Sequence, residues 1–285
     1  MNDKTVMNDT TDKPAVFTDT HTHLADPLLA EWSAEVIRQA NGAGVYRFIV
    51  PSANCGDWKA VSDLAADNIV PAFGIHPWWV GGTAERQDLD RLADYLAGHP
   101  QAWVGEIGLD YLRASDEAQR QRQRALLAAQ LQLAGDYRRP FILHNVRSTA
   151  DLLALLKQYR NPCGGIVHAF SGSLEEAAAF CKLGLKIGIG SLLLNPQAKK
   201  VRRAAAELAR EYGATLLLES TSNQVDQFGG YTGLTPAQYI AQVKTLLPAD
   251  ANPVYGGDHL GPNRWQHLPA DEAMQNSEEL IRHYI

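Results

Sequence analysis

The sequence has few cysteines, no long apolar run and no excess of basic residues, and each shortage excludes a class of protein. Three cysteines occur in 285 residues, and none is spaced as a CxxC pair. A disulfide framework is therefore not expected, and the chain suits a reducing compartment. We expect the thiols to be small, buried hydrophobic side chains. No stretch reaches the length of a membrane span, so we expect a soluble, cytoplasmic protein without a membrane partner.

The charge balance is mildly acidic. Against 26 Lys and Arg stand 32 Asp and Glu, which gives a net charge of −6 with histidine neutral. A protein that coats nucleic acid is usually basic. If nucleic acid is the substrate, the attraction must therefore come from bound metal and from local Lys and Arg side chains.

The first fourteen residues are polar and rich in Asp, Asn and Thr. They lack the apolar segment of a secretory signal. We expect residues 1–14 to form a disordered tail.

Short apolar runs alternate with amphipathic helical stretches along most of the chain. The expected strands, apolar on both faces as strands beneath a helical layer should be, are Val16–Thr20, Arg47–Pro51, Ile69–Ile75, Ala102–Ile107, Pro140–His144, Gly165–Ala169, Leu185–Ile189 and Thr215–Glu219. The helical stretches between them are residues 32–43, 58–67, 88–97, 116–134, 149–159, 174–183 and 197–212. Eight strands and seven helices in alternation predict an α/β fold and favour a closed (β/α)8 TIM-type barrel over an open sheet, although periodicity alone does not separate the two.

The C-terminal part adds elements for which an eight-stranded barrel has no slot. After the eighth strand come a Gly-rich loop, a helix near 235–247, a ninth strand-like run at Pro253–Gly257 and a final helix at about 271–284. We therefore divide the chain into a barrel at 15–219 and a segment at 220–285 that completes or decorates it. The ninth strand either lies outside the barrel or displaces the eighth.

Titratable side chains follow most of the expected strands. Side chains just past the C-terminal ends of barrel strands converge at one mouth. His21 and His23 point the same way, because residues i and i+2 of an extended segment share a face. The others of this kind are His76, Glu106, Asp110, His144, His168 and Glu219.

Five of these groups are expected to bind metal. Buried His and Glu side chains are costly unless they are paired or metal-bound, which favours a metal site over packing. The expected ligands are His21, His23, Glu106, His144 and His168. Such ligands, without thiolates, suit one or two ions of Zn²⁺, Mn²⁺ or Mg²⁺, and Glu106 could bridge two. A two-metal site is natural for phosphodiester hydrolysis, although hydrolysis of an amide or a lactone would need much the same parts.

Six motifs stand at these strand ends. They are residues 17–23 (FTDTHTH), 74–77 (GIHP), 104–111 (VGEIGLDY), 141–144 (FILH), 168–173 (HAFSGS) and 186–190 (KIGIG). In order and spacing they resemble the TatD family of metal-dependent deoxyribonucleases, over about residues 16–219. The resemblance implies an amidohydrolase-type barrel, the same five metal ligands, and 3′→5′ exonuclease or related phosphodiesterase activity on DNA.

Three further residues near the predicted mouth are expected to contact substrate. His76 and Asp110 match family motifs there. Trp78 follows His76 and either stacks on a base or packs against the barrel rim.

The end of the eighth strand departs from the family pattern. The resemblance implies a Glu-Thr-Asp sequence there, with the Asp as a metal ligand and partner of the attacking water. Here Thr221 stands in place of the Asp. A neutral hydroxyl is no general base at neutral pH, so catalysis is expected to be impaired. Glu219 and Asp258 are the candidate catalytic carboxylates beside Glu106, although Asp258 could simply suit the packing of its own strand.

The C-terminal segment carries a second resemblance. Residues 219–236 and 255–266 are similar to the GatZ/KbaZ subunit family of tagatose-bisphosphate aldolase, over about 216–285. On this interpretation, the chain is a fusion of two family-like segments, and their junction lies near Glu219. This leaves two alternatives to an active nuclease: a non-catalytic partner that associates weakly with an aldolase subunit through the C-terminal segment, or an inactive metal-binding fusion.

Overall fold

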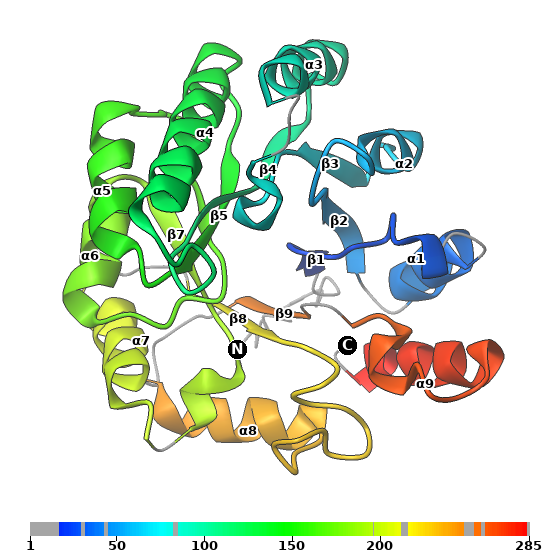
Figure 1. Ribbon diagram of the computed structural model, residues 1–285. Helices are drawn as coiled ribbons and strands as arrows, with labels where there is room; N and C mark the ends of the chain where they lie inside the picture. The colour runs from blue at the N-terminus through cyan, green and yellow to red at the C-terminus, as the bar shows by residue number, and fades with distance from the viewer. Residues whose placement is uncertain are drawn as a thin grey trace, which may run out of the picture.

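Parallel strands and helices alternate in the computed structural model, which describes residues 17–29, 32–42, 45–81, 85–195, 197–211, 216–247, 254–257 and 260–283 (Figure 1). The strands are β1 (Phe17–Asp19), β2 (Val45–Pro51), β3 (Ile69–Phe73), β4 (Trp103–Asp110), β5 (Phe141–Val146), β6 (Gly165–Val167), β7 (Leu185–Ile189), β8 (Leu216–Ser220) and β9 (Val254–Gly257). The expected tail at 1–14 lies outside the described residues.

Helices connect the strands on the outside of the sheet. The α-helices are α1 (Ser33–Gly42), α2 (Trp58–Asp63), α3 (Glu85–Gly98), α4 (Glu117–Asp136), α5 (Thr149–Gln158), α6 (Leu174–Lys182), α7 (Lys199–Glu211), α8 (Pro236–Leu246) and α9 (Ala270–His283). Short 3-10 helices are η1 (Pro27–Leu29), η2 (Pro77–Trp79), η3 (Ser191–Leu194) and η4 (Pro262–Trp265). The predicted alternation is confirmed, and the α/β barrel-like architecture with it.

The ninth strand belongs to the sheet. All neighbouring strands pair in parallel, in the order β1 to β9, and β9 pairs with β8 from Leu217 opposite Val254 to Ser220 opposite Gly257. On its other side, β9 lies close to β1 (Figure 1). The expectation that a ninth strand has no slot is therefore wrong: β9 neither leaves the barrel nor displaces β8, because it fills the space between β8 and β1.

The core has two parts because successive strand residues point to opposite faces. On β2, Phe48 and Val50 belong to the large cluster between the strands and the helices, whereas Ile49 belongs to a small cluster with Val70, Ala72 and Ile142. The small cluster therefore lies inside the barrel. Its burial and that of the helix-covered face explain why these strands are apolar on both faces.

The close contact between the ends of β4 and β5 requires a glycine at position 108. Between Val104 and Glu106 the register shifts, because two steps on β4 match the single step from Phe141 to Ile142 on β5. A bulge of this kind re-aims the next side chain, here Glu106. Gly108 has φ of +148°, and a Cβ there would lie 2.0 Å from the carbonyl oxygen of His144. Only glycine allows the two strand ends to come this close.

The C-terminal segment packs on the rest of the chain. α9 contacts both α1 and α8, and Leu280 and Trp265 are buried there. Within the described residues, no helix is long and apolar enough to span a bilayer. The three cysteines are free thiols, but Cys163 is exposed. The expectation of buried thiols is therefore wrong for Cys163, which lies in the turn before β6.

Candidate metal centre

Glu106 lies at the centre of a histidine cluster at the C-terminal ends of the strands. Its Oε2 is 3.2 Å from Nε2 of His21, and its Oε1 is 3.2 Å from Nδ1 of His144 and 3.4 Å from Nε2 of His76. The bulge and the glycines of β4 place this buried carboxylate between β1, β3 and β5. Each carboxylate oxygen therefore faces a different set of imidazoles.

The first set is the His-x-His pair after β1. The Nε2 atoms of His21 and His23 are 3.3 Å apart. Each of the two histidines and Glu106 has a potential ligand atom within 4.8 Å of those of the other two. Two ligands held about 2.1 Å from one tetrahedral metal are roughly 3.4 Å apart. The spacing therefore fits three ligands of one cation, as the strand ends predicted for these three residues.

The second set contains His144, and its surroundings fit a metal ligand. Nε2 of His144 faces Oδ2 of Asp110 at 3.3 Å, while Nδ1 faces Glu106. A neutral imidazole has a single N–H, so it can donate to only one of these two carboxylates. If that N–H points to Asp110, the lone pair on Nδ1 points toward Glu106, where a cation satisfies both. Carboxylate–histidine–metal chains of this kind are usual in metalloproteins.

His76 is the third member of the second set, and its backbone surroundings decide its role. Nδ1 of His76 accepts the backbone N–H of Trp78 at 3.2 Å, as the N-cap of η2. In the neutral ring the proton therefore sits on Nε2, which donates to Glu106. Because the Nε2 lone pair is then absent, His76 is placed as a hydrogen-bond donor beside the carboxylate, although its distances alone would allow a ligand.

His168 is close to the cluster but lies in neither set. Its ring stacks on that of His21, with centroids 4.1 Å apart and planes 17° from parallel. His168 therefore lies near the other expected ligands, at the end of β6, as its place after a strand predicted. The next residue, Ala169, has φ of +45°, so the chain turns directly after β6 and His168.

The electrostatics of the site favour neutral His21 and His23 side chains beside a charged Glu106 carboxylate. Burial, and next the charge of His168, hold the pKa of His21 well below its usual value, and burial likewise lowers the pKa of His23. Burial alone would raise the pKa of Glu106, but His21, His144 and His76 outweigh it and hold that pKa well below its usual value. Neutral histidine and ionised Glu are the metal-binding forms. Within the part of the chain described here, the donor set therefore fits a divalent cation.

Asp110 accepts hydrogen bonds from three groups of the protein in addition to its contact with His144. Oδ2 accepts Nε1–H of Trp78 at 2.6 Å, and Oδ1 accepts the backbone N–H groups of Leu112 and Arg113. Burial alone would raise the pKa of Asp110, but the hydrogen bonds from Trp78, Arg113 and His144 outweigh it and lower that pKa. In the structure Asp110 therefore faces His144, and Trp78 donates to Asp110. The substrate contacts that the sequence suggested for both residues stay predictions.

Two buried glutamines of α4 support the site and were not predicted from the sequence. Gln123 accepts the backbone N–H of Asp110 and donates to the carbonyl of Pro77, and Gln130 does the same for the N–H and C=O of Ile75. They hold the segments on either side of His76 and the end of β4. The sequence did contain a sign of their burial. The two Gln residues are seven positions apart, which places them on the same helix face as the buried Leu127 and Leu131.

The segment after β8 supplies no described carboxylate to the site. Thr221 begins a turn, with its carbonyl accepting the N–H groups of Gln224 and Val225. Glu219 belongs to β8, but its side chain is not among those that the structure describes. Asp258 lies outside the described residues. Among the described residues, Glu106 is the only carboxylate in either ligand set.

Comparison with known proteins agrees with this geometry. A family model described as TatD related DNase matches residues 18–248. The uncharacterized metal-dependent hydrolase YjjV of Escherichia coli (strain K12) is 40% identical over 213 residues, which are 72% of this chain and 78% of the relative. The crystal structure of YjjV, described as a TatD homolog, superposes with a TM-score of 0.65 and 32% identity over 94% of this chain and 97% of that chain.

Two other matches among solved structures support narrower conclusions. A TatD family hydrolase from Entamoeba histolytica has a TM-score of 0.56 at 23% identity, over 73% of this chain and 74% of that chain, which shows the fold alone. The resemblance of 216–285 to the GatZ/KbaZ family finds no support beyond a partial match to a probable tagatose 6 phosphate kinase from Sinorhizobium meliloti. That match is 46% identical but covers 30% of this chain and 23% of that chain with a TM-score of 0.28, which supports no structural argument.

Proposed function

Because the chain belongs to the family of TatD-related DNases, which are metal-dependent hydrolases, we propose that it hydrolyses phosphodiester bonds of DNA from the 3′ end. The observation that carries this proposal is the buried carboxylate of Glu106, set between two groups of imidazoles. A bridging carboxylate of this kind suits two cations close together, the arrangement that serves in-line displacement at phosphorus.

The proposed ligands are those that the strand ends predicted. His21, His23 and Oε2 of Glu106 would hold one cation, and Oε1 of Glu106 with Nδ1 of His144 the second. His168 is the proposed fifth ligand, on the strength of its place against His21. When bound, the cations would polarise the phosphodiester and lower the pKa of water. Mg²⁺, Mn²⁺ and Zn²⁺ all suit these donors.

The remaining polar residues orient the ligands and the substrate. Asp110 holds the N–H of His144 and so fixes its ring, and Trp78 fixes Asp110. His76 directs its Nε2–H to the Glu106 oxygen at 3.4 Å. When a phosphate is bound, we propose that this N–H donates to one of its non-bridging oxygens instead of to Glu106, which keeps the substrate role that the sequence suggested for His76.

The proton acceptor is the weak point of the proposed mechanism. Thr221 stands where the resemblance implies an Asp, and its hydroxyl cannot take a proton at neutral pH. Glu219 and Asp258 are the proposed alternatives. If Asp258 serves as the base, Asp258→Ala abolishes hydrolysis; full activity in that variant removes Asp258 from the mechanism and leaves Glu219, tested as Glu219→Gln.

A time course of cleavage of single-stranded DNA with Mg²⁺ or Mn²⁺ tests the proposed function. The matched control is the His21→Ala/His23→Ala double variant, and a second control adds EDTA. Cleavage that needs metal and disappears in the double variant supports the proposal. Cleavage that is indifferent to EDTA shows that the activity does not come from this site, and absence of cleavage in a metal-binding protein shows an inactive metal-binding fusion.

A partner role for the C-terminal segment is a separate proposal. Phe228 and Tyr231 are 71% and 72% exposed on the loop between β8 and α8. Such large apolar side chains are common in interfaces, and the resemblance of this segment names an aldolase subunit as the partner. Co-purification with a class II aldolase would support the association; its absence at micromolar concentrations would remove it.

A further inference from the structure

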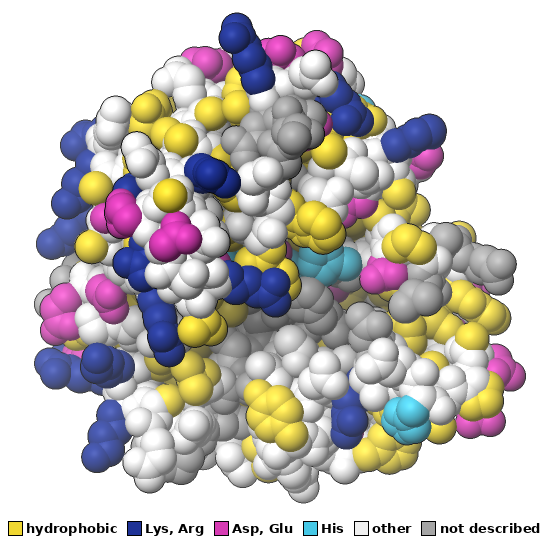
Figure 2. Space-filling model, viewed as in Figure 1, with side chains coloured by type: hydrophobic (Ala, Val, Ile, Leu, Met, Phe, Trp, Pro, Cys, Tyr) yellow, Lys and Arg dark blue, Asp and Glu magenta, His cyan; other side chains and the backbone are white. Residues whose placement is uncertain are grey.

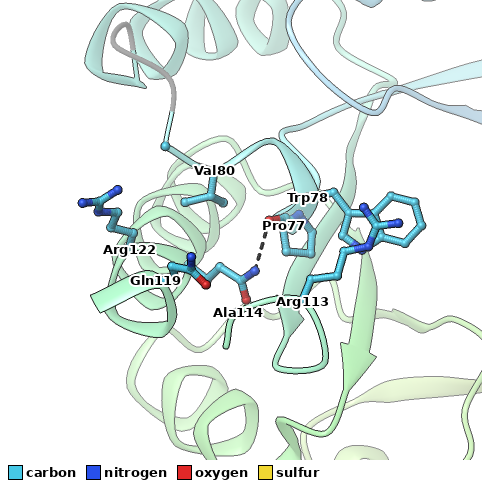
Figure 3. Close-up of a pocket in the computed structure, with 9 residues that line it drawn as sticks. Pro77, Trp78, Val80, Arg113, Ala114, Gln119 and Arg122 are labelled. Atoms are coloured by element: carbon cyan, nitrogen blue, oxygen red, sulfur yellow. Dashed lines mark hydrogen bonds between the residues drawn. The ribbon is translucent and has the colours of Figure 1, made fainter. Parts of the chain in front are cut away.

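A pocket of about 310 Å³ opens beside the metal centre, between η2 and the start of α4. We call it the arginine pocket, lined by Pro77, Trp78, Arg113, Gln119 and Arg122 among others. Figure 3 shows Arg113 over Trp78 on one side of the pocket and Arg122 on the other, with Gln119 and Pro77 between them. Its volume is at the lower end of the range of about 300–1,000 Å³ for small-ligand sites.

The two arginines of the pocket differ from a third arginine nearby. Arg124, which also belongs to α4, is tied to Glu117 and Asp151. Arg113 and Arg122 are exposed, and no Asp or Glu lines the pocket between them. Within the described part of the chain, neither guanidinium forms an ion pair. In a protein of net charge −6, two guanidinium groups on one acid-free pocket are a local attraction for an anion.

Arg113 is held in place for such an interaction. Its Cζ lies 3.7 Å from the centroid of the Trp78 ring, a cation–π contact that orients the planar guanidinium. Its backbone N–H donates to Asp110, the residue that supports His144. The arginine pocket is therefore connected to His144 of the metal centre through Trp78 and Asp110.

Gln119 adds a donor between the arginines. Its Oε1 accepts the backbone N–H of Ser115 at 2.9 Å, which directs its amide nitrogen away from that bond. Guanidinium and amide donors without an acceptor partner recognise phosphate oxygens well. Figure 2 shows that Lys and Arg side chains gather mainly over α4 to α6, with a histidine side chain visible near the middle of the same face.

We propose that the arginine pocket is a second phosphate subsite, which binds the phosphate next to the scissile one on a DNA strand. The inference rests on the proposed function. Successive phosphates of a strand are one nucleotide apart, so a strand with its scissile phosphate at Glu106 must carry another phosphate into the neighbourhood of the cluster. The pocket has the charge, the donors and the attachment to His144 that this neighbour requires. The enzyme then prefers oligonucleotides over diesters with a single phosphate.

Binding without cleavage tests the subsite separately from the activity. The probe is a fluorescein-labelled thymidine tetranucleotide, titrated in EDTA and followed by fluorescence anisotropy at several salt concentrations. The variants are Arg113→Gln, Arg122→Gln and the double variant. The matched control is Arg160→Gln, because Arg160 is also exposed but follows the C-terminal end of α5, at the opposite end of the barrel.

The double variant is expected to bind the tetranucleotide at least tenfold more weakly, and Arg160→Gln to match the parent protein. The slope of log affinity against log salt should fall by about 0.7 for each DNA phosphate that an arginine no longer neutralises. Affinity and slope that stay at the parent values in the double variant overturn the subsite, as does a parent protein that does not bind the probe.

A kinetic ratio gives the second readout. In the double variant, kcat/KM for the tetranucleotide divided by kcat/KM for bis(p-nitrophenyl) phosphate should fall about tenfold. An unchanged ratio overturns the subsite. If the parent protein cleaves neither substrate, the proposed function fails, and the anisotropy titration alone still decides whether the arginine pocket binds DNA phosphates.

Discussion

Oε1 of Glu106 lies 3.2 Å from Nδ1 of His144, and this contact joins the end of β4 to the end of β5. Gly108 makes the approach possible, since any side chain there would collide with the backbone of His144. The absence of a side chain at Gly108 therefore allows the contact between Glu106 and His144 on which the proposed metal site depends. It also makes Glu106 the residue on which both proposed cation positions depend.

Replacing Glu106 with Gln is expected to abolish metal binding at both positions. The amide keeps the shape but loses the charge that the neighbouring imidazoles face. Loss of residues that merely support ligands costs about 10–100-fold in metal affinity, so loss of a shared ligand should cost more. Titration calorimetry with Mn²⁺ measures this, with the exposed Glu272→Gln as control. Two ions bound with parent affinity would contradict a bridging role.

The metal-free protein is expected to lose stability as the pH falls below about 6.5. The pKa of His21 is well below its usual value of 6.5 in the folded protein because of burial. The unfolded chain therefore binds more protons than the folded one between those two pKa values, and stability drops as the pH falls through this window. Each such histidine contributes up to about 1.4 kcal/mol per pH unit.

Urea unfolding in EDTA at pH 7.5, 6.5 and 5.5 measures the slope. His21→Gln removes one titrating group and should flatten it, whereas Gln132→Leu, which replaces an exposed side chain that does not titrate, should leave it unchanged. An identical slope in His21→Gln and the parent would show that His21 does not titrate in this way. At lower pH, protonation of Glu106, whose pKa is also lowered, adds a second loss that begins below about 4.5.

Gln130 is expected to stabilise the segment before His76 by a few kcal/mol. Its amide donates to the carbonyl of Ile75 and accepts the N–H of the same residue, and it is buried. Gln130→Leu leaves both backbone groups unsatisfied, at about 1–3 kcal/mol each. Urea unfolding of this variant should show the loss, with the exposed Gln132→Leu as control. Equal stability of the two variants would contradict the role given to Gln130.

Ala169 is expected to be a strained residue. Its φ of +45° is costly for any residue with a Cβ, by about 1–2 kcal/mol. Ala169→Gly should therefore raise the free energy of unfolding by about 1 kcal/mol. Ala150→Gly, in the exposed first turn of α5, should lower it by up to about 1 kcal/mol. In thermal unfolding experiments, the two substitutions should move Tm in opposite directions. A lower Tm in both variants would show that Ala169 is unstrained.

The strands and the convergence of the His and Glu side chains could be predicted from the sequence because both follow from local patterns. An apolar run such as Ile69–Phe73 can be buried on both faces only beneath helices, and polar residues at strand ends must meet at one mouth. His21, His23 and Glu106 come together for that reason alone. The position of β9 could not be predicted, because it depends on the space between β8 and β1, which no local pattern records.

The roles of the residues around the cluster could not be predicted either. Which nitrogen of His76 carries the proton is decided by the backbone N–H of Trp78. The partner of Asp110 is decided by where the ring of His144 falls on the next strand. Such choices depend on side-chain directions across strands, whereas sequence spacing fixes only which residues reach the mouth.

Thr221→Asp is expected to raise the rate of DNA hydrolysis. Thr221 directly follows β8, at the same end of the parallel sheet as the cluster, and its carbonyl accepts the N–H groups of Gln224 and Val225. A carboxylate there would supply both a ligand and a proton acceptor, and a well-placed general base contributes about 10²–10⁴-fold. We expect at least a tenfold gain in kcat, measured with Mn²⁺ on single-stranded DNA. Thr221→Asn, which has the same shape without the charge, is the control and should stay at the parent rate. Equal rates in the two variants would show that the proton acceptor is not limiting and that Glu219 or Asp258 already provides it.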